Sequence, residues 1–429
     1  MRNLVKSGLG IAALLVAASP ALADETCNSP YTLSLIKGQE DFLHVWTLGE
    51  IGVGDESDKL VTVDVQPSSP TYGKVINSIS VGGRGEAHHT GFTDDRRYLW
   101  AGRLDDNKIF VFDLADPAKP KIVKTITDFA EKTGFVGPHT FYAIPGRMMV
   151  QALSNTRTHD GQTGIAVYNN GGDLVSVHPM PLENGGDGYG YDIGINPQKN
   201  AMLTSSFTGW TNYMMDMGQM IKDPEAMKRF GKSMVMWDFK AMQPISIMEV
   251  PGSPLEIRWS LKPEDNWAFS ATALTSKLWL IKQDETGAWV ARDVATIGDP
   301  AKIPLPVDIS ISADAKGLWV NTFLDGTSRY FDISNPEAPK QVYARKMGSQ
   351  VNMVSQSYDG KRVYFTTSLL ANWDKKGAEN EQWLKAFDWD GKQLVEKFTV
   401  DFKAQKLGRA HHMKLSAKTK AAAIGDERR

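Results

Sequence analysis

The chain has 429 residues, with 48 Lys and Arg against 50 Asp and Glu and a single cysteine. This near-neutral balance argues against nucleic acid or an anionic lipid surface as a partner. Because Cys27 is the only cysteine, an intrachain disulfide is excluded, and we interpret Cys27 as a spectator rather than a nucleophile.

The first residues predict export. Arg2 and Lys6 give a positively charged start, followed by the apolar stretch G-L-G-I-A-A-L-L-V-A-A, which is too short to span a bilayer, and by an A-L-A cleavage site. We therefore predict that residues 1–23 are a Sec-type signal peptide and that residues 24–429 act in the periplasm. Loss of the two basic residues changes the formal charge from −2 to −4. We expect no membrane span in the remainder of the chain.

A short strand that ends in an acidic turn recurs along the rest of the chain. The clearest copies are L-V-T-V-D-V at 60, I-F-V-F-D-L at 109, M-V-M-W-D-F at 234, S-R-Y-F-D-I at 328 and L-K-A-F-D-W at 384, and weaker copies start at 164 and 277. Most copies are preceded by two turn-linked strands and followed by another alternating strand. Seven such units of about four strands each, with little helix, are typical of a β-propeller.

The units at the two ends of the chain are incomplete. The N-terminal part supplies L-V-T-V-D-V and V-I-N-S-I-S-V before the first full unit opens at His88, and the C-terminal part supplies H-H-M-K-L-S and A-A-A-I-G. Joined, these strands complete one blade, and closing the ring in this way removes exposed sheet edges. We predict an all-β fold, a single seven-bladed propeller over residues 24–429.

Each predicted inner strand begins with one polar residue. In blade order these residues are His89, His139, Asp192, Glu256, Asp308, Asn352 and His412. Inner strands of a propeller run along the central channel, so we expect these side chains to meet at one mouth of it. The preceding position is apolar, aromatic or Pro in five blades, but it is His88 in the first and His411 in the last, and these two blades are neighbours in a closed ring.

The closed ring therefore gathers imidazoles in one sector of the mouth. They are five of the eight histidines of the chain: His88, His89, His139, His411 and His412. Imidazole clusters favour Zn, Cu, Fe or Ni over Mg or Ca, and we predict a copper site. Because successive side chains on a strand point to opposite faces, we expect only one histidine of each adjacent pair to reach a given ion. The alternative is that the imidazoles only cap strands and bridge blades.

Three carboxylates are expected across the mouth from the imidazoles. We interpret Asp192 and Glu256 as catalytic groups that orient ligand imidazoles or transfer protons. Structural hydrogen bonding is the competing interpretation for each of them and for Asp308.

The third predicted blade carries an insertion over residues 207–232, which we expect to lie over one face of the ring as a lid. Its second half has Pro224 near a helix start and Gly231 at a stop. The insertion carries five methionines: Met214, Met215, Met217, Met220 and Met227. Thioethers suit Cu(I) as ligands, and the competing interpretation is that they serve ordinary packing.

Taken together, these motifs resemble the selenium-binding protein family, whose bacterial members are copper-dependent periplasmic methanethiol oxidases. The similarity covers nearly all of residues 24–429, through V-T-V-D-V-Q-P-S-S-P-T-Y, E-A-H-H-T-G-F, G-P-H-T, G-Y-D-I-G-I-N-P, P-L-E-I-R-W, Y-F-D-I-S-N-P, S-Y-D-G-K-R-V-Y-F-T-T-S-L-L-A-N-W-D-K and R-A-H-H-M-K-L. The resemblance implies a seven-bladed propeller, with a small volatile thiol and O2 as partners. It implies oxidation of methanethiol, with O2 and water, to formaldehyde, hydrogen sulfide and hydrogen peroxide.

By motif, the resemblance carries the family's histidines onto His88, His89, His139 and His411, whereas His412 stands where relatives commonly have Glu. Animal members have a cysteine in the segment matching F-L-H-V-W-T-L-G and a Cys-containing stretch after the His-His-x-Gly motif, and this chain has neither. We therefore expect no selenium binding through cysteine. Two alternatives stay open, namely a non-catalytic propeller that binds copper or selenium and an oxidase of another small thiol. The sequence leaves the oligomeric state open.

Overall fold

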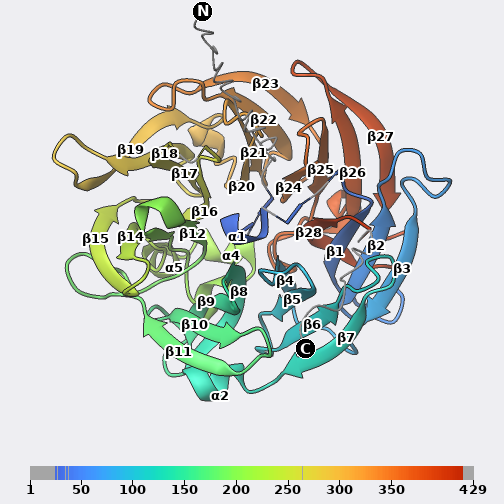
Figure 1. The fold of residues 1–429 in the computed structure, drawn as a ribbon, viewed down its shortest axis with the longest axis horizontal. Coiled ribbons are helices and arrows are strands. Elements are labelled where there is room, and N and C mark those ends of the chain that lie inside the picture. Colours follow the sequence, from blue (N-terminus) through green and yellow to red (C-terminus); the bar gives the residue numbers. More distant parts are fainter. Residues whose placement is uncertain (1–24, 27, 34, 37, 263, 419–429) are drawn as a thin grey trace, which may run out of the picture.

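Four-stranded antiparallel sheets form the whole architecture. The computed structural model describes residues 25–26, 28–33, 35–36, 38–262 and 264–418. In that part of the chain, seven four-stranded sheets stand around one axis as the blades of a propeller (Figure 1). The predicted fold is confirmed. The predicted signal peptide, Cys27 and the A-A-A-I-G segment lie outside the described residues.

The strands run outward from the axis in each blade. The inner strands are β4 (Ala87–Phe92), β8 (Phe135–Ile144), β12 (Ile193–Asn196), β16 (Pro254–Trp259), β20 (Pro306–Ile311), β24 (Val354–Gln356) and β28 (Arg409–Ser416). The second strands are β5 (Tyr98–Arg103), β9 (Arg147–Asn155), β13 (Ala201–Thr204), β17 (Trp267–Thr272), β21 (Gly317–Thr322), β25 (Arg362–Thr366) and β1 (Phe42–Leu48). The third strands are β6 (Ile109–Asp113), β10 (Gly164–Asn169), β14 (Ser233–Asp238), β18 (Lys277–Gln283), β22 (Thr327–Asp332), β26 (Trp383–Trp389) and β2 (Lys59–Asp64). The outer strands are β7 (Lys121–Ile126), β11 (Leu174–Pro179), β15 (Gln243–Glu249), β19 (Trp289–Thr296), β23 (Lys340–Lys346), β27 (Leu394–Asp401) and β3 (Val75–Ser80).

The blade that closes the ring combines both ends of the chain, in the order β28-β1-β2-β3. The prediction of two strands from each end is wrong, because three strands come from the N-terminal part and one from the C-terminal part. The pattern did not identify β1 as a strand of this blade, since every residue of F-L-H-V-W-T-L is buried. A strand that is buried on both faces lacks the alternation by which strands are recognised.

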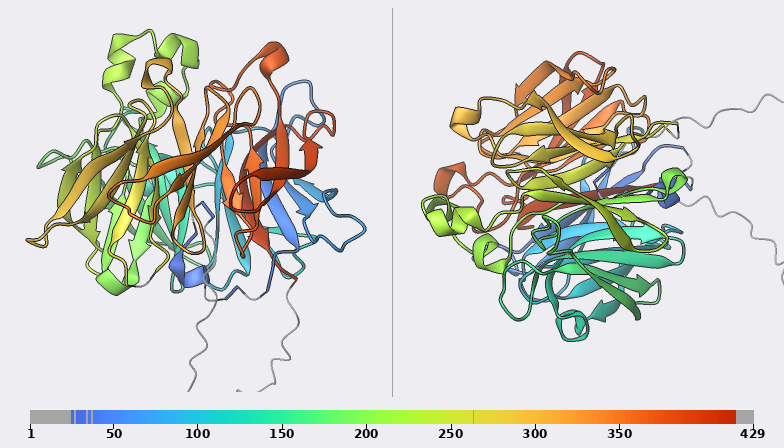
Figure 2. Two further views of the ribbon diagram at one scale, coloured as in Figure 1. Left: turned by 90° about the horizontal axis from the view of Figure 1, so that it is seen from above. Right: turned by 90° about the vertical axis from the view of Figure 1, so that its left-hand side faces the viewer.

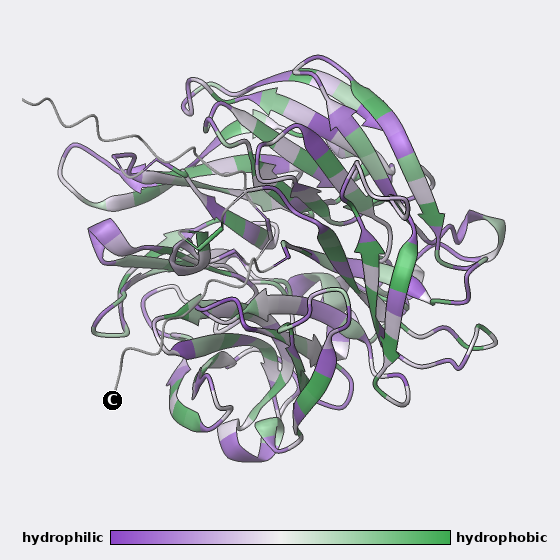
Figure 3. Cartoon of the chain, turned by 45° about the vertical axis from the view of Figure 1, so that its right-hand side comes forward, coloured by the Kyte–Doolittle hydropathy of each residue, from purple (hydrophilic) through white to green (hydrophobic). Residues whose placement is uncertain are grey.

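The hydrophobic core lies between adjacent blades. The three inner strands of each blade are largely buried, whereas outer strands such as β3 alternate between half-buried and exposed residues. Figure 3, which colours each residue by hydropathy, shows hydrophilic and hydrophobic residues mixed along the strands. At the closing blade, Trp46 packs 5.9 Å from the rings of both Phe110 and Phe112 on β6, and its Nε1 donates to the Gly102 carbonyl at 2.9 Å. Burying one such aromatic side chain stabilises the fold by about 1.5–3 kcal/mol.

Helices are few and short. They are α1 (Pro30–Leu33), α2 (Phe129–Thr133), α3 (Trp210–Tyr213), α4 (Met217–Met220) and α5 (Pro224–Lys228), with 3-10 turns η1 (Pro197–Lys199), η2 (Pro300–Lys302) and η3 (Gly377–Glu379). In the part of the chain that the structure describes, no helix is long and apolar enough to cross a membrane. The insertion 207–232 holds α3 to α5, and Pro224 opens α5 as predicted.

The two faces of the ring carry different segments. Figure 2 shows α3 to α5 and the loop bearing η3 on one face, and α1 on the other. On the α1 face, the Thr26 hydroxyl donates to the Asp308 carboxylate at 2.9 Å, and the Leu415 amide donates to Glu25 at 2.6 Å. The segment before α1 therefore covers that end of the channel.

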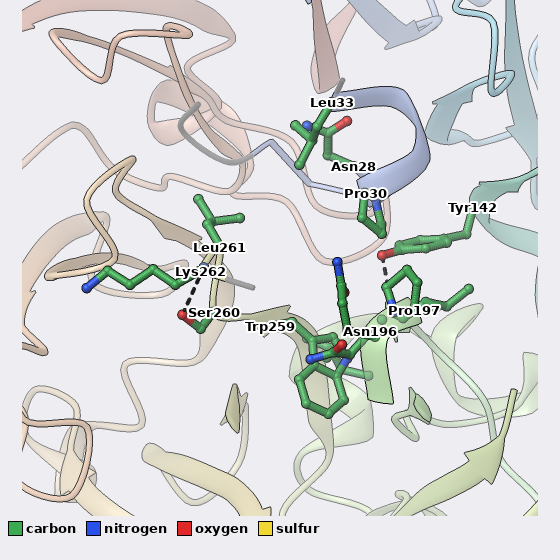
Figure 4. A pocket seen from close by; sticks show the side chains of 14 residues that line it. Asn28, Pro30, Leu33, Tyr142, Asn196, Pro197, Trp259, Ser260, Leu261 and Lys262 are labelled. Atoms are coloured by element: carbon green, nitrogen blue, oxygen red, sulfur yellow. Dashed lines mark hydrogen bonds between the residues drawn. The ribbon is translucent and has the colours of Figure 1, made fainter. Parts of the chain in front are cut away.

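A cavity of about 110 Å³ lies beside α1, between Asn28, Tyr142 and Trp259 (Figure 4). The Tyr142 hydroxyl accepts the Ile195 amide there at 3.2 Å. Among the described residues, the lining of this cavity includes no histidine, cysteine or carboxylate. Its lining therefore lacks the side chains that bind a redox metal.

Candidate metal centre

The structure brings the five predicted histidines together on the inner strands β4, β8 and β28. We call them the imidazole cluster, and each is at most 2% exposed. Ring centroids lie 4.0 Å apart for the pairs His88–His411 and His89–His139, and 4.7 Å apart for His89–His412. One nitrogen from each of His88, His89 and His139 lies within 4.8 Å of the other two. Three imidazoles can therefore reach a single small ion.

β-Bulges explain how neighbouring residues share this site. The ladder between inner and second strand shifts register at His88 and His89 in β4, at His139 in β8 and at His411 in β28. A bulge places an extra residue in one strand and re-aims its side chain. The rings of His88 and His89 stack with their centroids 4.9 Å apart, and both belong to the group of three. Both histidines of this pair can therefore approach the same ion, in contrast to the expectation of one ligand per pair.

The H-H-T-G motif requires glycine at position 91 for a steric reason. A Cβ atom at Gly91 would collide with the carbonyl of Phe141 on the neighbouring inner strand. Only glycine permits this approach of β4 to β8. The approach in turn brings the ring of His89 within 4.0 Å of that of His139.

Backbone carbonyls fix the tautomers of two of the imidazoles. Nδ1 of His139 lies 3.1 Å from the Tyr191 carbonyl, and Nδ1 of His411 lies 2.6 Å from the Ser368 carbonyl. A carbonyl can only accept, so both Nδ1 atoms carry the proton and both Nε2 atoms carry a lone pair. Ligand histidines in metal sites are commonly held in this way.

The nitrogens that face the centre of the cluster lack protein partners. Among the described residues, no hydrogen bond reaches Nδ1 of His88 or Nε2 of His139, His411 and His412, although these atoms are buried. For His412 the other nitrogen is occupied, since its Nδ1 lies 2.8 Å from the Thr90 hydroxyl. Buried polar atoms are rarely left unpaired in native structures.

Burial keeps these imidazoles neutral. Desolvation, together with the neighbouring imidazoles, lowers the pKa of His88, His89 and His139 well below the usual value. Burial also lowers the pKa of His412 well below that value and the pKa of His411 to about 3. Neutral imidazoles with lone pairs turned to one centre fit copper or another transition ion of similar preference. The alternative interpretation, that the imidazoles only cap strands and bridge blades, explains the Nδ1 contacts of His139, His411 and His412. It does not explain why their buried Nε2 atoms have no hydrogen bond from the described residues.

Across the channel, the three carboxylates gather around a cation that the sequence analysis missed. Arg258 donates from Nη1 to Asp192 at 3.3 Å and to Glu256 at 3.2 Å, and from Nη2 to Asp308 at 3.0 Å. We call these four residues the carboxylate cluster. The signal for Arg258 was present in E-I-R-W, because the residue two after Glu256 on a strand faces the same side.

The carboxylates differ in how fully they are bonded. Besides Arg258, Asp192 accepts the Ile193 and Ile257 amides at 2.8 Å, so both of its oxygens are engaged within the protein. Oε1 of Glu256 lies 3.8 Å from Nε2 of His89, which makes Glu256 the carboxyl next to the imidazole cluster. Burial and the neighbouring Asp192 raise the pKa of Glu256 well above its usual value, and burial raises the pKa of Asp308 to about 6.

A small apolar cavity adjoins the imidazole cluster. It is lined by His88, Tyr191, Phe207, Leu255, Ala273, Leu305, Val307, Leu369, Leu370 and Trp373, and it leaves about 10 Å³ for the centre of a water-sized sphere. Tyr191, Leu255 and Val307 occupy the position before the polar strand head, which is the position of His88 in the first blade. One ring of positions therefore supplies the polar groups, and the preceding ring supplies part of the apolar wall.

The insertion lies on one face of the ring, and its first residue, Phe207, lines this cavity. Its Phe207 packs edge-on against Trp373 of the loop between β25 and β26, with ring centroids 5.6 Å apart. Of its methionines, Met217 and Met220 are buried in the apolar cluster that contains Phe207 and Trp373, and Met214, Met215 and Met227 pack against that cluster. This placement accounts for them as packing residues.

Comparison with known proteins identifies relatives over nearly the whole chain. The family model described as 56 kDa selenium-binding protein (SBP56) matches residues 23–422. A protein of Hyphomicrobium sp named methanethiol oxidase is 77% identical, over 94% of this chain and 93% of its own length. One of Ruegeria pomeroyi with the same name is 57% identical, over 92% of this chain and 94% of its own.

Among solved structures, a hypothetical selenium-binding protein from Sulfolobus tokodaii superposes with a TM-score of 0.78 at 24% identity. The match covers 91% of this chain and 97% of that one. At this identity the similarity establishes the fold alone.

Proposed function

Because the chain belongs to the 56 kDa selenium-binding protein family, we propose that it is a methanethiol oxidase with copper bound by the imidazole cluster. The observation that carries this proposal is a cluster of buried, neutral imidazoles in which nitrogens of His88, His139, His411 and His412 have no hydrogen bond from the described residues, with His88 also lining a small apolar cavity. The names of the relatives that are 77% and 57% identical support the choice of substrate.

In the proposed reaction, methanethiol, O2 and water give formaldehyde, hydrogen sulfide and hydrogen peroxide. Carbon loses two electrons and O2 gains two, so atoms and electrons balance with no further reactant. When bound, copper ionises a coordinating thiol and supplies a redox centre for O2. The ligands we propose are His88, His89 and His139, with His411 and His412 next to them.

The protein's own residues prepare the site. The carbonyls of Tyr191 and Ser368 hold His139 and His411 in the tautomer that presents a lone pair. The apolar walls exclude bulk water and contact the methyl group of the substrate. These contacts pre-organise the ligands and the cavity before the substrate arrives.

Of the two carboxylates predicted to be catalytic, we propose Glu256 as the group that exchanges protons with the site, at its Oε1 atom. Geometry supports this choice, since Oε1 lies 3.8 Å from Nε2 of His89. We propose Asp192 as a positioning residue, because its bonds to the Ile257 amide and Arg258 join β12 to β16.

We also propose that the protein works in the periplasm after removal of residues 1–23, from the charge, apolar stretch and A-L-A site at its start. Mass spectrometry of the periplasmic protein tests this directly. An N-terminus at Asp24 is expected, and a retained Met1 would contradict it.

Copper content and O2 uptake together test the activity. Protein loaded with copper and then desalted is expected to keep about one ion per chain. It should consume O2 only when methanethiol is added, and release formaldehyde, sulfide and peroxide in equal amounts. Protein that keeps no copper would refute the metal site.

A storage protein would keep copper without any uptake of O2. Glu256→Gln separates the two functions further. In an oxidase this substitution should lower kcat by about 100-fold while copper stays bound. In a storage protein it should change neither copper content nor a background rate of O2 uptake.

A further inference from the structure

The roof of the apolar cavity is built from two segments far apart in the sequence. One is the insertion 207–232 of the third complete blade, and the other is the loop 368–376 between β25 and β26. They meet through the Asn372 side-chain amide, which donates to the Met214 carbonyl at 2.9 Å, and through an ion pair between Asp216 and Lys376. We call the two segments the roof.

We propose that Phe207 and Trp373 of the roof set the size limit for the substrate and restrict the enzyme to the one-carbon thiol. This inference rests on the proposed function and names the residues that choose among thiols. The two rings meet edge-on, with centroids 5.6 Å apart, and both line the cavity beside His88.

The volume of the cavity carries the inference. The centre of a water-sized sphere has about 10 Å³ in which to move, so the cavity takes a small group such as methyl with little space to spare. Methanethiol places one methyl group next to its sulfur, whereas ethanethiol places two carbons there. The second carbon finds no space unless a wall moves.

The wall at Trp373 is held in place by buried polar contacts. Asp374 is 3% exposed and accepts the Leu369 amide at 2.9 Å, the Ser368 hydroxyl at 2.7 Å and Nη1 of Arg409 at 2.9 Å. The Trp373 amide itself donates to the Leu370 carbonyl at 2.8 Å. Moving this loop to admit a larger thiol would cost free energy, because these buried hydrogen bonds would have to break.

The wall at Phe207 is braced by other aromatic rings. Its ring lies edge-on to Tyr191 at 5.3 Å and to Phe230 at 5.9 Å. Phe207 is the first residue of the insertion, and its carbonyl accepts the amide of Gly231 near the other end of the insertion at 2.5 Å. Both walls are therefore rigid, as a size filter requires.

The test compares thiols of increasing size on the copper-loaded protein. The values of kcat/KM are measured for methanethiol, ethanethiol and 1-propanethiol in wild type, Trp373→Leu, Trp373→Ala and Phe207→Ala. Enlarging the cavity is expected to raise the ethanethiol-to-methanethiol ratio by about tenfold or more, and Trp373→Leu should fall between wild type and Trp373→Ala.

Trp383→Ala is the matched control. Trp383 is as buried as Trp373, at 5% exposure, and belongs to the same blade, but it does not line the cavity. Its substitution should cost stability and leave the ratio as in wild type. A ratio that rises equally in this control would overturn the proposal, because loosening alone would then explain it.

A second measurement needs neither copper nor turnover. Crystals of the metal-free protein are pressurised with xenon, which fills apolar cavities large enough to hold it. We expect no xenon beside His88 in wild type and one bound atom there in Trp373→Ala. Xenon already bound in wild type would refute the size limit, as would an unchanged thiol ratio in every roof variant.

The two proposals fail in different ways. A wild-type protein that consumes no O2 with methanethiol refutes the proposed function, and the xenon result then decides whether the roof limits the cavity. A wild-type protein that oxidises methanethiol and ethanethiol equally well refutes the size limit alone.

Discussion

Two sectors of one ring of strand heads have opposite chemistry. In the imidazole cluster, on β28, β4 and β8, several buried nitrogens turned to the centre have no hydrogen bond from the described residues. In the carboxylate cluster, Asp192 and Asp308 accept bonds from backbone amides as well as from Arg258. Position in the fold is the same in both sectors, so position alone does not make a site. The difference lies in which polar groups the protein leaves for a ligand.

The contrast also separates two energetic situations. A buried carboxylate that meets a guanidinium and amide donors is compensated within the protein. A buried imidazole nitrogen without a donor carries a cost unless a ligand supplies its partner. Asp192 and Asp308 therefore join neighbouring inner strands, whereas the imidazole cluster keeps nitrogens for which a ligand would supply the partner.

The largest effect should follow removal of one ligand. His139→Ala is expected to reduce bound copper to less than about a tenth and to abolish thiol-dependent O2 uptake, because it deletes one of three converging nitrogens. Copper by mass spectrometry and O2 by electrode measure both.

His44→Gln is the matched control for this substitution. His44 is 1% exposed, but Thr62 and Ser416 occupy both of its ring nitrogens, at 3.2 and 2.8 Å. It should lose stability and keep copper. Equal copper loss in the two variants would show that buried histidines matter here only for folding.

Breaking the carboxylate cluster should affect stability more than binding. Arg258→Met leaves three buried carboxyl groups without their shared cation, so the free energy of unfolding should fall by about 3–5 kcal/mol at pH 8. Denaturant titration measures this change. The exposed ion pair of Arg292 with Glu337 gives the control, and Arg292→Met should cost less than about 1 kcal/mol. A loss below that level at Arg258 would contradict its structural role.

The carboxylate cluster should also give a pH dependence, through Asp308. The pKa of Asp308 is about 6 in the folded protein, against an ordinary value of 3.8, because burial outweighs the nearby Arg258. The pKa of Glu256, in the same cluster, is raised as well. A raised acid pKa contributes stability that is full below pH 3.8 and is lost as the pH rises through about 6.

Comparison with Asp308→Asn isolates this contribution. Wild type should lose about 1–3 kcal/mol relative to this variant between pH 4 and pH 7, since other titrating groups cancel in the difference. Urea titrations of both proteins across that range measure it. Parallel stability curves for the two proteins would contradict the assignment.

The smallest effect is expected in the roof. Met217→Leu and Met220→Leu conserve volume at buried apolar positions, so the free energy of unfolding should change by less than about 1.5 kcal/mol and bound copper should stay the same. If either variant lost half of its copper, we would conclude that these thioethers are copper ligands and that the metal site extends into the roof.

The spacing of motifs in the sequence predicted much of the fold and of the candidate site. The repeating strand with an acidic turn predicted the number of blades, and alignment of the inner strands placed His89, His139 and His412 on successive blades. Prediction from the sequence failed where the local residue pattern carries no structural signal. A fully buried β1 shows no alternation, so the division of the closing blade was wrong. Arg258 was overlooked although it stands two residues after Glu256 on the same strand, because its partners Asp192 and Asp308 come from other blades.

By itself, then, the sequence determined the ring and the residue types at its mouth, because both depend on local periodicity and on the count of units. Only the tertiary structure decided how those residues are used. Bulges in the inner strands turn both His88 and His89 to one centre, and they arise from pairing with second strands, which local alternation does not encode. The roof likewise exists only where Phe207 and Trp373 meet, since its two segments are more than a hundred residues apart.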